Sequence, residues 1–174
     1  MHRISPLLSI AILSAMSGCA GYQIGNQTLY PAHISTVYVP VIESASFRRN
    51  LGERLTEAVV KEIELRTPYK VTGDPNADSV LRCRLVRDTK RVTIPSRTGD
   101  ATQLQISMQV DVSWTDRQGL VLRQAAPLPL PPEIIGVTGS SELTPQVGQS
   151  VATAQQEAIQ QIAQQIVGMM EAPW

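Results

Sequence analysis

The residue with the most distinctive chemical setting is Cys19, whose thiol follows an uncharged segment near the start of the chain. A short basic start precedes residues 4–15, which are almost wholly apolar, and Ser17 and Gly18 come directly before the thiol. This order is typical of a secretory signal peptide. The apolar run is well short of the roughly 20 residues that a helix needs to cross a bilayer.

The four residues Met16-Ser17-Gly18-Cys19 resemble a bacterial lipobox, in which a lipid is attached to the thiol and cleavage then exposes the acylated Cys. Met16 stands where Leu is usual. Ala20, in place of Asp, resembles the pattern of lipoproteins sent on to the outer membrane. We therefore predict a lipoprotein signal peptide over residues 1–18, lipidation of Cys19 and a lipidated tether over residues 19–35. The alternative is an ordinary signal peptide whose Cys is incidental.

No other residues have the spacing of a catalytic or metal site. His33 is the only His after the predicted cleavage point, and no Cys–His pattern lies near it, so we expect neither a metal nor a cofactor. A nucleophile–base pair and a Gly-rich phosphate loop are also missing, so an enzyme is not expected. Cys83, between Arg82 and Arg84, is interpreted as a buried and unreactive strand residue.

The composition argues against nucleic-acid binding. The 15 basic and 15 acidic residues balance, so no overall field attracts a polyanion. One Phe and two Trp are few for a base-stacking surface. Removal of residues 1–18 leaves about the length of a single domain.

Basic residues nevertheless gather in one segment, with Asp88 as the only acid among them. They are Arg82, Arg84, Arg87, Lys90, Arg91 and Arg97. Guanidinium groups pair bidentately with phosphate, so we predict that Arg87, Lys90, Arg91 and Arg97 contact an anionic head group. The alternatives are a charged strand edge that prevents edge-to-edge aggregation, and solvated pairs with acids elsewhere.

The β-branched segment 36–42 predicts a strand, with Pro40 at an edge or a strand end, and residues 43–46 predict a turn. A short extended piece is expected at residues 69–71. A longer strand is expected from Val80 to about Ile94, with a bulge between Val86 and Lys90 where the apolar phase shifts.

Strict alternation predicts the next strand, whose apolar residues share one face. They are Leu104, Ile106, Met108, Val110, Val112 and Trp114. A turn at residues 116–119 then leads into residues 120–122 as a hairpin. Residues 127–132 are Pro-rich and predict a polyproline-like excursion that carries Ile134 and Ile135.

Two segments have helical periodicity. The first begins after Asn50, a candidate N-cap with Glu53 three residues on, and ends near Arg66. Its predicted apolar side is Leu51, Leu55, Ala58, Val59, Ile63 and Leu65. Its predicted solvent side is Glu53, Arg54, Glu57, Lys61, Glu62 and Glu64. The second helix is expected from Thr144 or Val147 to Met170, with Pro145 in its first turn.

One face of the second helix is rich in Gln, and Glu157 is the only charged residue from Leu143 to Met170. Its predicted core stripe is Val151, Ala154, Ala158, Ile162, Ile166 and Met169. An uncharged polar face suits a protein surface or lumen, so we predict that Gln156, Gln160 and Gln164 contact a partner. The alternative is an ordinary solvated face.

The order of elements predicts a single α+β domain over residues 36–172, with two helices packed on one face of a mostly antiparallel four- to five-stranded sheet. Within this order, residues 19–25 are similar to the Cys-Gly-Tyr start of LptE-type lipoproteins. Residues 37–40, 51–58 and 114–122 also resemble the pattern of that family. The Pro-rich residues 127–132 depart from it.

The resemblance implies a lipid-anchored protein on the periplasmic side of the outer membrane. It implies a plug in the LptD β-barrel that helps to deliver lipopolysaccharide to the outer leaflet. The expected partners are therefore an LptD-like barrel, lipopolysaccharide and the membrane, without nucleic acid. The alternative function is a free membrane-anchored module that binds a polyanion or a lipid without a barrel partner.

Overall fold

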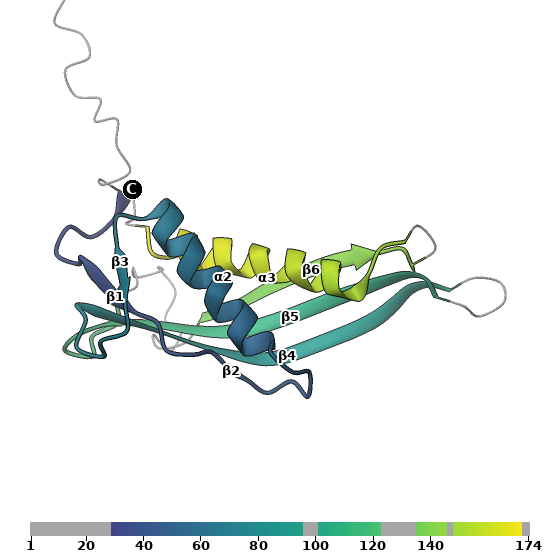
Figure 1. Cartoon of the computed structure of the whole chain (residues 1–174), viewed down its shortest axis with the longest axis horizontal. Helices are drawn as coiled ribbons and strands as arrows, with labels where there is room; N and C mark the ends of the chain where they lie inside the picture. Colours follow the sequence, from purple (N-terminus) through teal and green to yellow (C-terminus); the bar gives the residue numbers. More distant parts are fainter. Residues whose placement is uncertain (1–28, 96–100, 123–134, 146–147, 172–174) are drawn as a thin grey trace, which may run out of the picture.

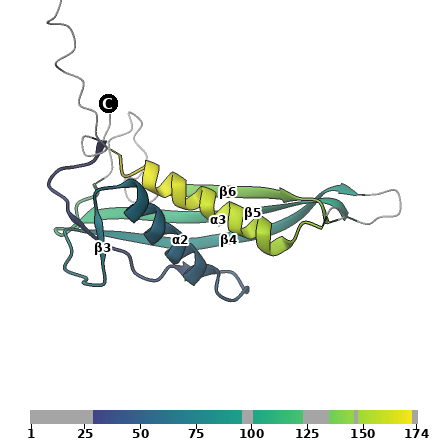
Figure 2. The same ribbon diagram turned by 45° about the horizontal axis from the view of Figure 1, so that its top comes forward.

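A computed structural model describes residues 29–95, 101–122, 135–145 and 148–171. Its elements in chain order are β1 (Thr36–Tyr38), β2 (Glu43–Ser44), α2 (Leu51–Arg66), β3 (Lys70–Thr72), β4 (Ser79–Pro95), β5 (Ala101–Asp116), β6 (Ile135–Leu143) and α3 (Val151–Gly168). Figures 1 and 2 show the two helices lying on one face of a single elongated sheet. The predicted α+β class, with two helices on one face of the sheet, is confirmed.

The sheet is mixed, and its two longest ladders are antiparallel, which agrees with the predicted mostly antiparallel sheet. Its order is β3-β1-β4-β5-β6, and β2 pairs separately with β4. β4, β5 and β6 form antiparallel ladders, but β1 runs parallel to β3 and β4, and β2 runs parallel to β4. Parallel neighbours arise because α2 carries the chain from β1 and β2 back to the same end of the sheet.

The segment predicted as one strand over residues 36–42 is a strand only at its start. β1 ends at Tyr38, and Glu43 and Ser44, predicted to lie in a turn, form β2 instead. Val37 pairs with Ser79 and Glu43 pairs with Arg84. The segment from Val37 to Glu43 is therefore one residue longer than the segment of β4 that it lies beside. Pro40 lies in this interruption, where a residue without an N–H costs no ladder hydrogen bond.

The alternation in β5 predicted its buried face correctly. All six apolar residues from Leu104 to Trp114 are buried against the helices, and Gly119 takes a positive φ in the turn that follows. Thr115 then pairs with Val121, which confirms the predicted hairpin.

β6 was missed, because the segment around Ile135 was predicted as part of a Pro-rich excursion. Residues 127–132 themselves lie outside the described residues. Two inward positions of β6 are Gly139 and Ser141, so its apolar alternation is weak. The small residue at 139 is required: a Cβ there would overlap the carbonyl oxygen of Ala158 and come within 2.7 Å of Ile162 Cγ1. α3 therefore packs directly on the backbone of β6.

α2 has the predicted bounds but differs in detail. Asn50 stands at the N-cap in a left-handed conformation without a side-chain capping bond, so the predicted capping box does not form. Glu62, predicted to face solvent, is only 3% exposed, and Leu65, predicted to face the core, is 73% exposed. The helix is rotated relative to the prediction because α3 packs along its side and covers Glu62.

α3 begins later than predicted. Ser150 is its N-cap and accepts a hydrogen bond from the N–H of Thr153 at 3.1 Å, so Pro145 does not lie in the first turn. The predicted core stripe faces the sheet, with Val151 and Met169 partly buried at its two ends.

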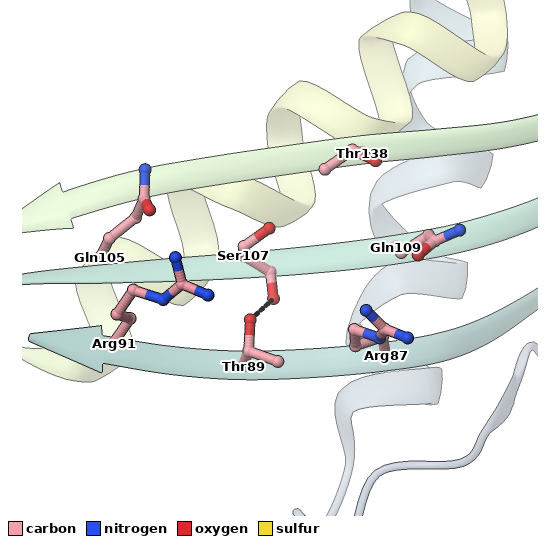
Figure 3. A pocket seen from close by; sticks show the side chains of 7 residues that line it. All are labelled: Arg87, Thr89, Arg91, Gln105, Ser107, Gln109 and Thr138. Atoms are coloured by element: carbon pink, nitrogen blue, oxygen red, sulfur yellow. Dashed lines mark hydrogen bonds between the residues drawn. The ribbon is translucent and has the colours of Figure 1, made fainter.

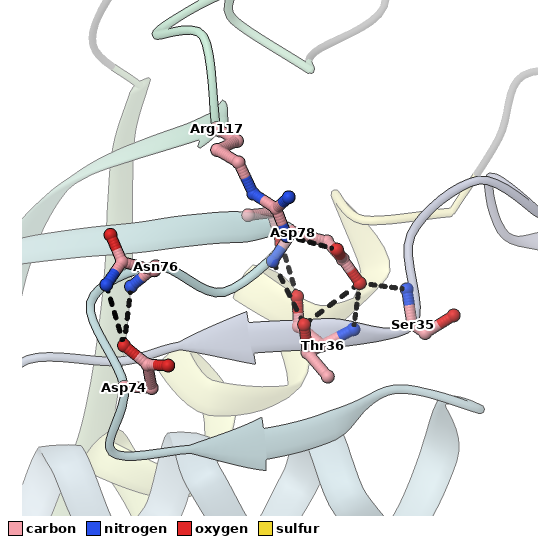
Figure 4. A network of polar contacts seen from close by, with 7 residues as sticks. Ser35, Thr36, Asp74, Asn76, Asp78 and Arg117 are labelled. Carbon is pink, nitrogen blue, oxygen red and sulfur yellow. Dashed lines mark hydrogen bonds and ion pairs between the residues drawn. The ribbon is translucent and has the colours of Figure 1, made fainter.

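The packed domain begins before β1. Tyr30 and Ile34 are buried, so the core includes the last residues of the segment predicted as a tether. Asp78 fixes the start of β1 beside that of β4: its Oδ2 accepts hydrogen bonds from the N–H groups of Ser35 and Thr36 and from the Thr36 hydroxyl, at 2.9–3.1 Å. Its Oδ1 pairs with Arg117 at 2.8 Å (Figure 4).

Candidate functional site

A bulge in β4 places four arginines on the sheet face opposite the helices. Arg82 pairs with Ser113 and Arg84 with Asp111; the register then shifts between Leu85 and Arg87. Arg87 pairs with Gln109 and Arg91 with Gln105. Directly paired residues of an antiparallel ladder share a face, and these β5 partners all belong to its polar face. The bulge predicted near Val86 is confirmed. Because of it, the even-numbered Arg82 and Arg84 lie on the same face of the sheet as the odd-numbered Arg87 and Arg91.

Arg87 and Arg91 line a shallow hollow of about 270 Å³ on this face. Its lining residues are Arg87, Thr89, Arg91, Gln105, Ser107, Gln109 and Thr138. Figure 3 shows Arg91 reaching over the sheet beside Gln105 and Arg87 lying beside Gln109, with Thr89 donating to the carbonyl oxygen of Ser107 at 3.4 Å. The lining holds two guanidinium groups and no carboxylate.

This arrangement favours an anion. Among the described residues, no ion pair joins Arg87 or Arg91 to an acid. Guanidinium groups bind phosphate and carboxylate through paired N–H donors, and the surrounding amides and hydroxyls can add neutral hydrogen bonds. The hollow therefore has the chemistry to hold a phosphate-sized anion at the surface.

The structure divides the basic set predicted from the sequence. Lys90 pairs with the buried Ile106, so its side chain lies on the helix side of the sheet, away from Arg87 and Arg91. Arg97 lies outside the described residues. Lys90 has the same parity as the apolar Val92, which also lies on the helix side, and this pattern could have indicated its face.

A second hollow of about 420 Å³ lies farther along the same face, where β1 gives way to β2. Arg82 and Arg84 line it, but so do Glu43 and Asp111. Two acids balance two bases there, so this hollow has no preference for an anion.

The glutamines of α3 mostly serve the fold. Gln156 accepts a hydrogen bond from Arg54 and Gln160 donates to the buried Glu62, both at 2.9 Å, so these two amides join α3 to α2. On the other side of α3, Gln161 and Gln165 bond the backbone of β6 at Ser140 and Thr138. Gln164 is exposed, and no hydrogen bond is recorded for its side chain among the described residues.

Cys83 is buried, as predicted, and burial raises the pKa of its thiol to about 12. The thiol therefore remains protonated at neutral pH. The described part of the chain has no cluster of three metal-ligating side chains, and neither of its helices is long and apolar enough to cross a membrane.

The model of the LptE family, described as lipopolysaccharide-assembly, matches residues 34–170. The chain belongs to the LptE family. The match begins just before β1 and ends after α3, so it spans both helices and every strand. The resemblance seen in the sequence is thereby confirmed.

Two solved structures share the LptE-like fold of this chain. Lipoprotein B from Nitrosomonas europaea is 17% identical, with 85% of this chain and 91% of that one covered and a TM-score of 0.50. A PelC dodecamer from Paraburkholderia phytofirmans is 12% identical in sequence, with 88% and 96% covered and a TM-score of 0.50. Identities this low show the fold alone. A comparison with curated protein sequences gives no match.

Proposed function

We propose that this chain is a lipoprotein of the outer membrane that works with an LptD-like β-barrel in the transport of lipopolysaccharide to the outer leaflet. The observation that carries the proposal is the family match over residues 34–170, which covers every described helix and strand. The role is that of a non-enzymatic assembly partner.

Cys19 would anchor the protein on the periplasmic side of the membrane. The predicted signal peptide and Cys19 lie outside the described residues, so their support is the lipobox-like sequence. A single acyl chain binds a membrane only marginally, and lipoprotein processing supplies several.

Arg87 and Arg91 would contact the phosphates of the lipopolysaccharide head group, since they line one hollow without a carboxylate. Lys90 and Arg97 remain part of the proposed basic set, but Lys90 could reach the same ligand only from the other side of the sheet. On the helix side, Gln164 is the best placed of the three glutamines to meet the barrel, because Gln156 and Gln160 are engaged with α2.

Isolation of the acylated protein from outer membranes in mild detergent tests this function. We expect a large β-barrel protein to co-purify in fixed stoichiometry and lipopolysaccharide to bind the complex. A chain that binds lipopolysaccharide but elutes as a monomer without a barrel would favour the alternative, a free membrane-anchored module for a lipid or a polyanion.

A further inference from the structure

The outer half of β4 has an open edge. β1 pairs with β4 at Ser79 and Val80 and β2 at Arg84 and Leu85; in the described part of the chain, no strand pairs with that edge beyond Leu85. β4 continues to Pro95, and β5 is the only described strand that pairs with it there. Figures 1 and 2 show this part of the β4–β5 hairpin projecting beyond α2.

The register identifies which backbone groups the edge offers. The carbonyl oxygen of Leu85 accepts from the N–H of Ala45, so Leu85 turns its backbone groups away from β5. Successive residues of an antiparallel strand turn these groups to opposite sides, and the bulge adds one residue. Asp88, Lys90 and Val92 therefore present their N–H and C=O groups at the open edge, while Thr89 and Arg91 bond β5.

The two faces beside this edge differ in chemistry. On the open face lie Arg87 and Arg91, separated by Thr89. On the helix side lie Lys90 and Val92, and Val92 is 49% exposed. A second register shift pairs Ile94 with Gln103, so Ile94, which is 51% exposed, lies on the open face beyond Arg91. Exposed β-branched side chains at a bare sheet edge are an aggregation hazard unless something covers them.

We propose that the edge of β4 from Arg87 to Val92 docks an extended segment of a partner protein in which acidic and apolar residues alternate. Addition of a strand to a sheet edge takes its affinity from backbone hydrogen bonds and its specificity from alternate side chains. The acidic residues would lie beside Arg87 and Arg91 on the open face, and an apolar residue would lie beside Val92 on the helix side. This inference goes beyond lipopolysaccharide assembly and does not depend on it.

A second copy of this chain fits the edge less well. Two β4 edges paired in antiparallel fashion would bring Arg87, Lys90 and Arg91 of one copy close to the same residues of the other. Like charges directly across a ladder are destabilising. The charge of the edge therefore favours a partner of opposite sign.

The probe is a capped ten-residue peptide that alternates Glu and Val, added to the purified full chain in detergent. We expect binding by fluorescence anisotropy and shifts of the amide resonances of Asp88, Lys90 and Val92. A peptide with the same composition in two blocks should bind at least fivefold more weakly, and so should the alternating peptide with N-methylated valines, because one backbone hydrogen bond is worth about 1 kcal/mol. Equal binding by the N-methylated peptide would overturn the proposal.

Variants of the chain test the edge from its own side. Val92→Pro removes an edge N–H that no strand uses, a position where proline is tolerated, and should weaken peptide binding about fivefold or more. The double variant Arg87→Glu with Arg91→Glu should weaken peptide binding further. The control Arg82→Glu lies on the same face, where β1 and β2 already cover the edge, and should leave peptide binding unchanged.

Glycolipid phosphate would compete for the two arginines but not for the backbone edge, so Val92→Pro should leave lipopolysaccharide binding unchanged. Peptide binding that is indifferent to Val92→Pro, or a chain that dimerises through this edge, would contradict the proposal.

Discussion

At the scale of single residues, the Asp78 side chain connects three segments of the domain. It joins the segment before β1, the start of β4 and Arg117 in the turn after β5. The hydrogen bond from the Thr36 hydroxyl, then the N–H groups of Ser35 and Thr36, hold the pKa of its carboxyl below the usual value, with Arg117 adding a smaller contribution. The ionised form is therefore the one that stabilises the fold.

We predict that Asp78→Asn lowers the free energy of unfolding at pH 7 by roughly 1–2 kcal/mol, because charged acceptors make the stronger hydrogen bonds. A lowered pKa in the folded state gives stability that is complete above the unfolded value, near pH 4, and is lost as the pH falls through the folded value. The difference between wild type and variant should therefore shrink below about pH 4. Denaturant melts between pH 3 and pH 7 measure it, and a difference independent of pH would show that the charge is not responsible.

Arg87 and Arg91 give a second prediction at this scale. Replacement of both by Glu should weaken lipopolysaccharide binding, and wild-type binding should fall with added salt, since exposed charges are screened within about 10 Å at 0.1 M. Arg82→Glu is the matched control, because Arg82 lies on the same face but lines the second hollow, where two acids balance the two bases. Affinity that is indifferent to both the arginine reversal and the salt would leave these residues with only a protective role at the edge.

At the scale of elements, the contact of α3 with β6 depends on Gly139. Gly139→Ala should destabilise the domain by about 1–3 kcal/mol or more, because the new Cβ meets backbone as well as Ile162. Gly136→Ala on the same strand is the control, since the atom nearest to its added Cβ would be Gln109 Nε2 at 3.7 Å. Thermal melts of the two variants decide the matter; equal stability would mean that α3 can shift without cost.

The glutamine face of α3 can be tested at Gln164, the exposed residue of the predicted partner set that has no described contact with α2. Gln164→Lys changes an exposed residue and should leave the melt within about 0.5 kcal/mol of wild type. If this face meets the barrel, a buried unpaired charge should reduce co-purification strongly. The control is Gln118→Lys, which makes the same chemical change in the exposed turn after β5 and should leave co-purification unchanged. Undiminished co-purification by Gln164→Lys would remove this part of α3 from the interface.

At the scale of the whole molecule, we predict that the membrane anchor can be removed without unfolding the domain. Cys19→Ala should leave a folded domain, because the described core begins at Tyr30 and Ile34. The variant should leave the membrane fraction, since no acyl chain remains to hold it. Fractionation in high salt checks this, with the circular dichroism melt as the control for folding. Persistence in the membrane pellet of cells that lack the barrel would show that lipid is not the anchor.

The sequence by itself determined the features that depend on local periodicity. The alternation from Leu104 to Trp114 predicted a buried face, and the phase shift after Leu85 predicted the bulge. The candidate N-cap Asn50 and the end expected near Arg66 predicted the bounds of α2. These signals are strong because each residue in them faces one environment along its whole element.

The tertiary structure decided what depends on neighbours distant in sequence. Glu62 is buried because α3 lies against it, β6 forms because α3 can rest on Gly139, and Gln160 turns inward because Glu62 needs a donor. Arg82 and Arg91 share a face only because one extra residue enters β4 between them. A one-residue change of register reverses every side chain beyond it, so the composition of the anion-binding hollow depends on the strand pairing as well as on the residues themselves.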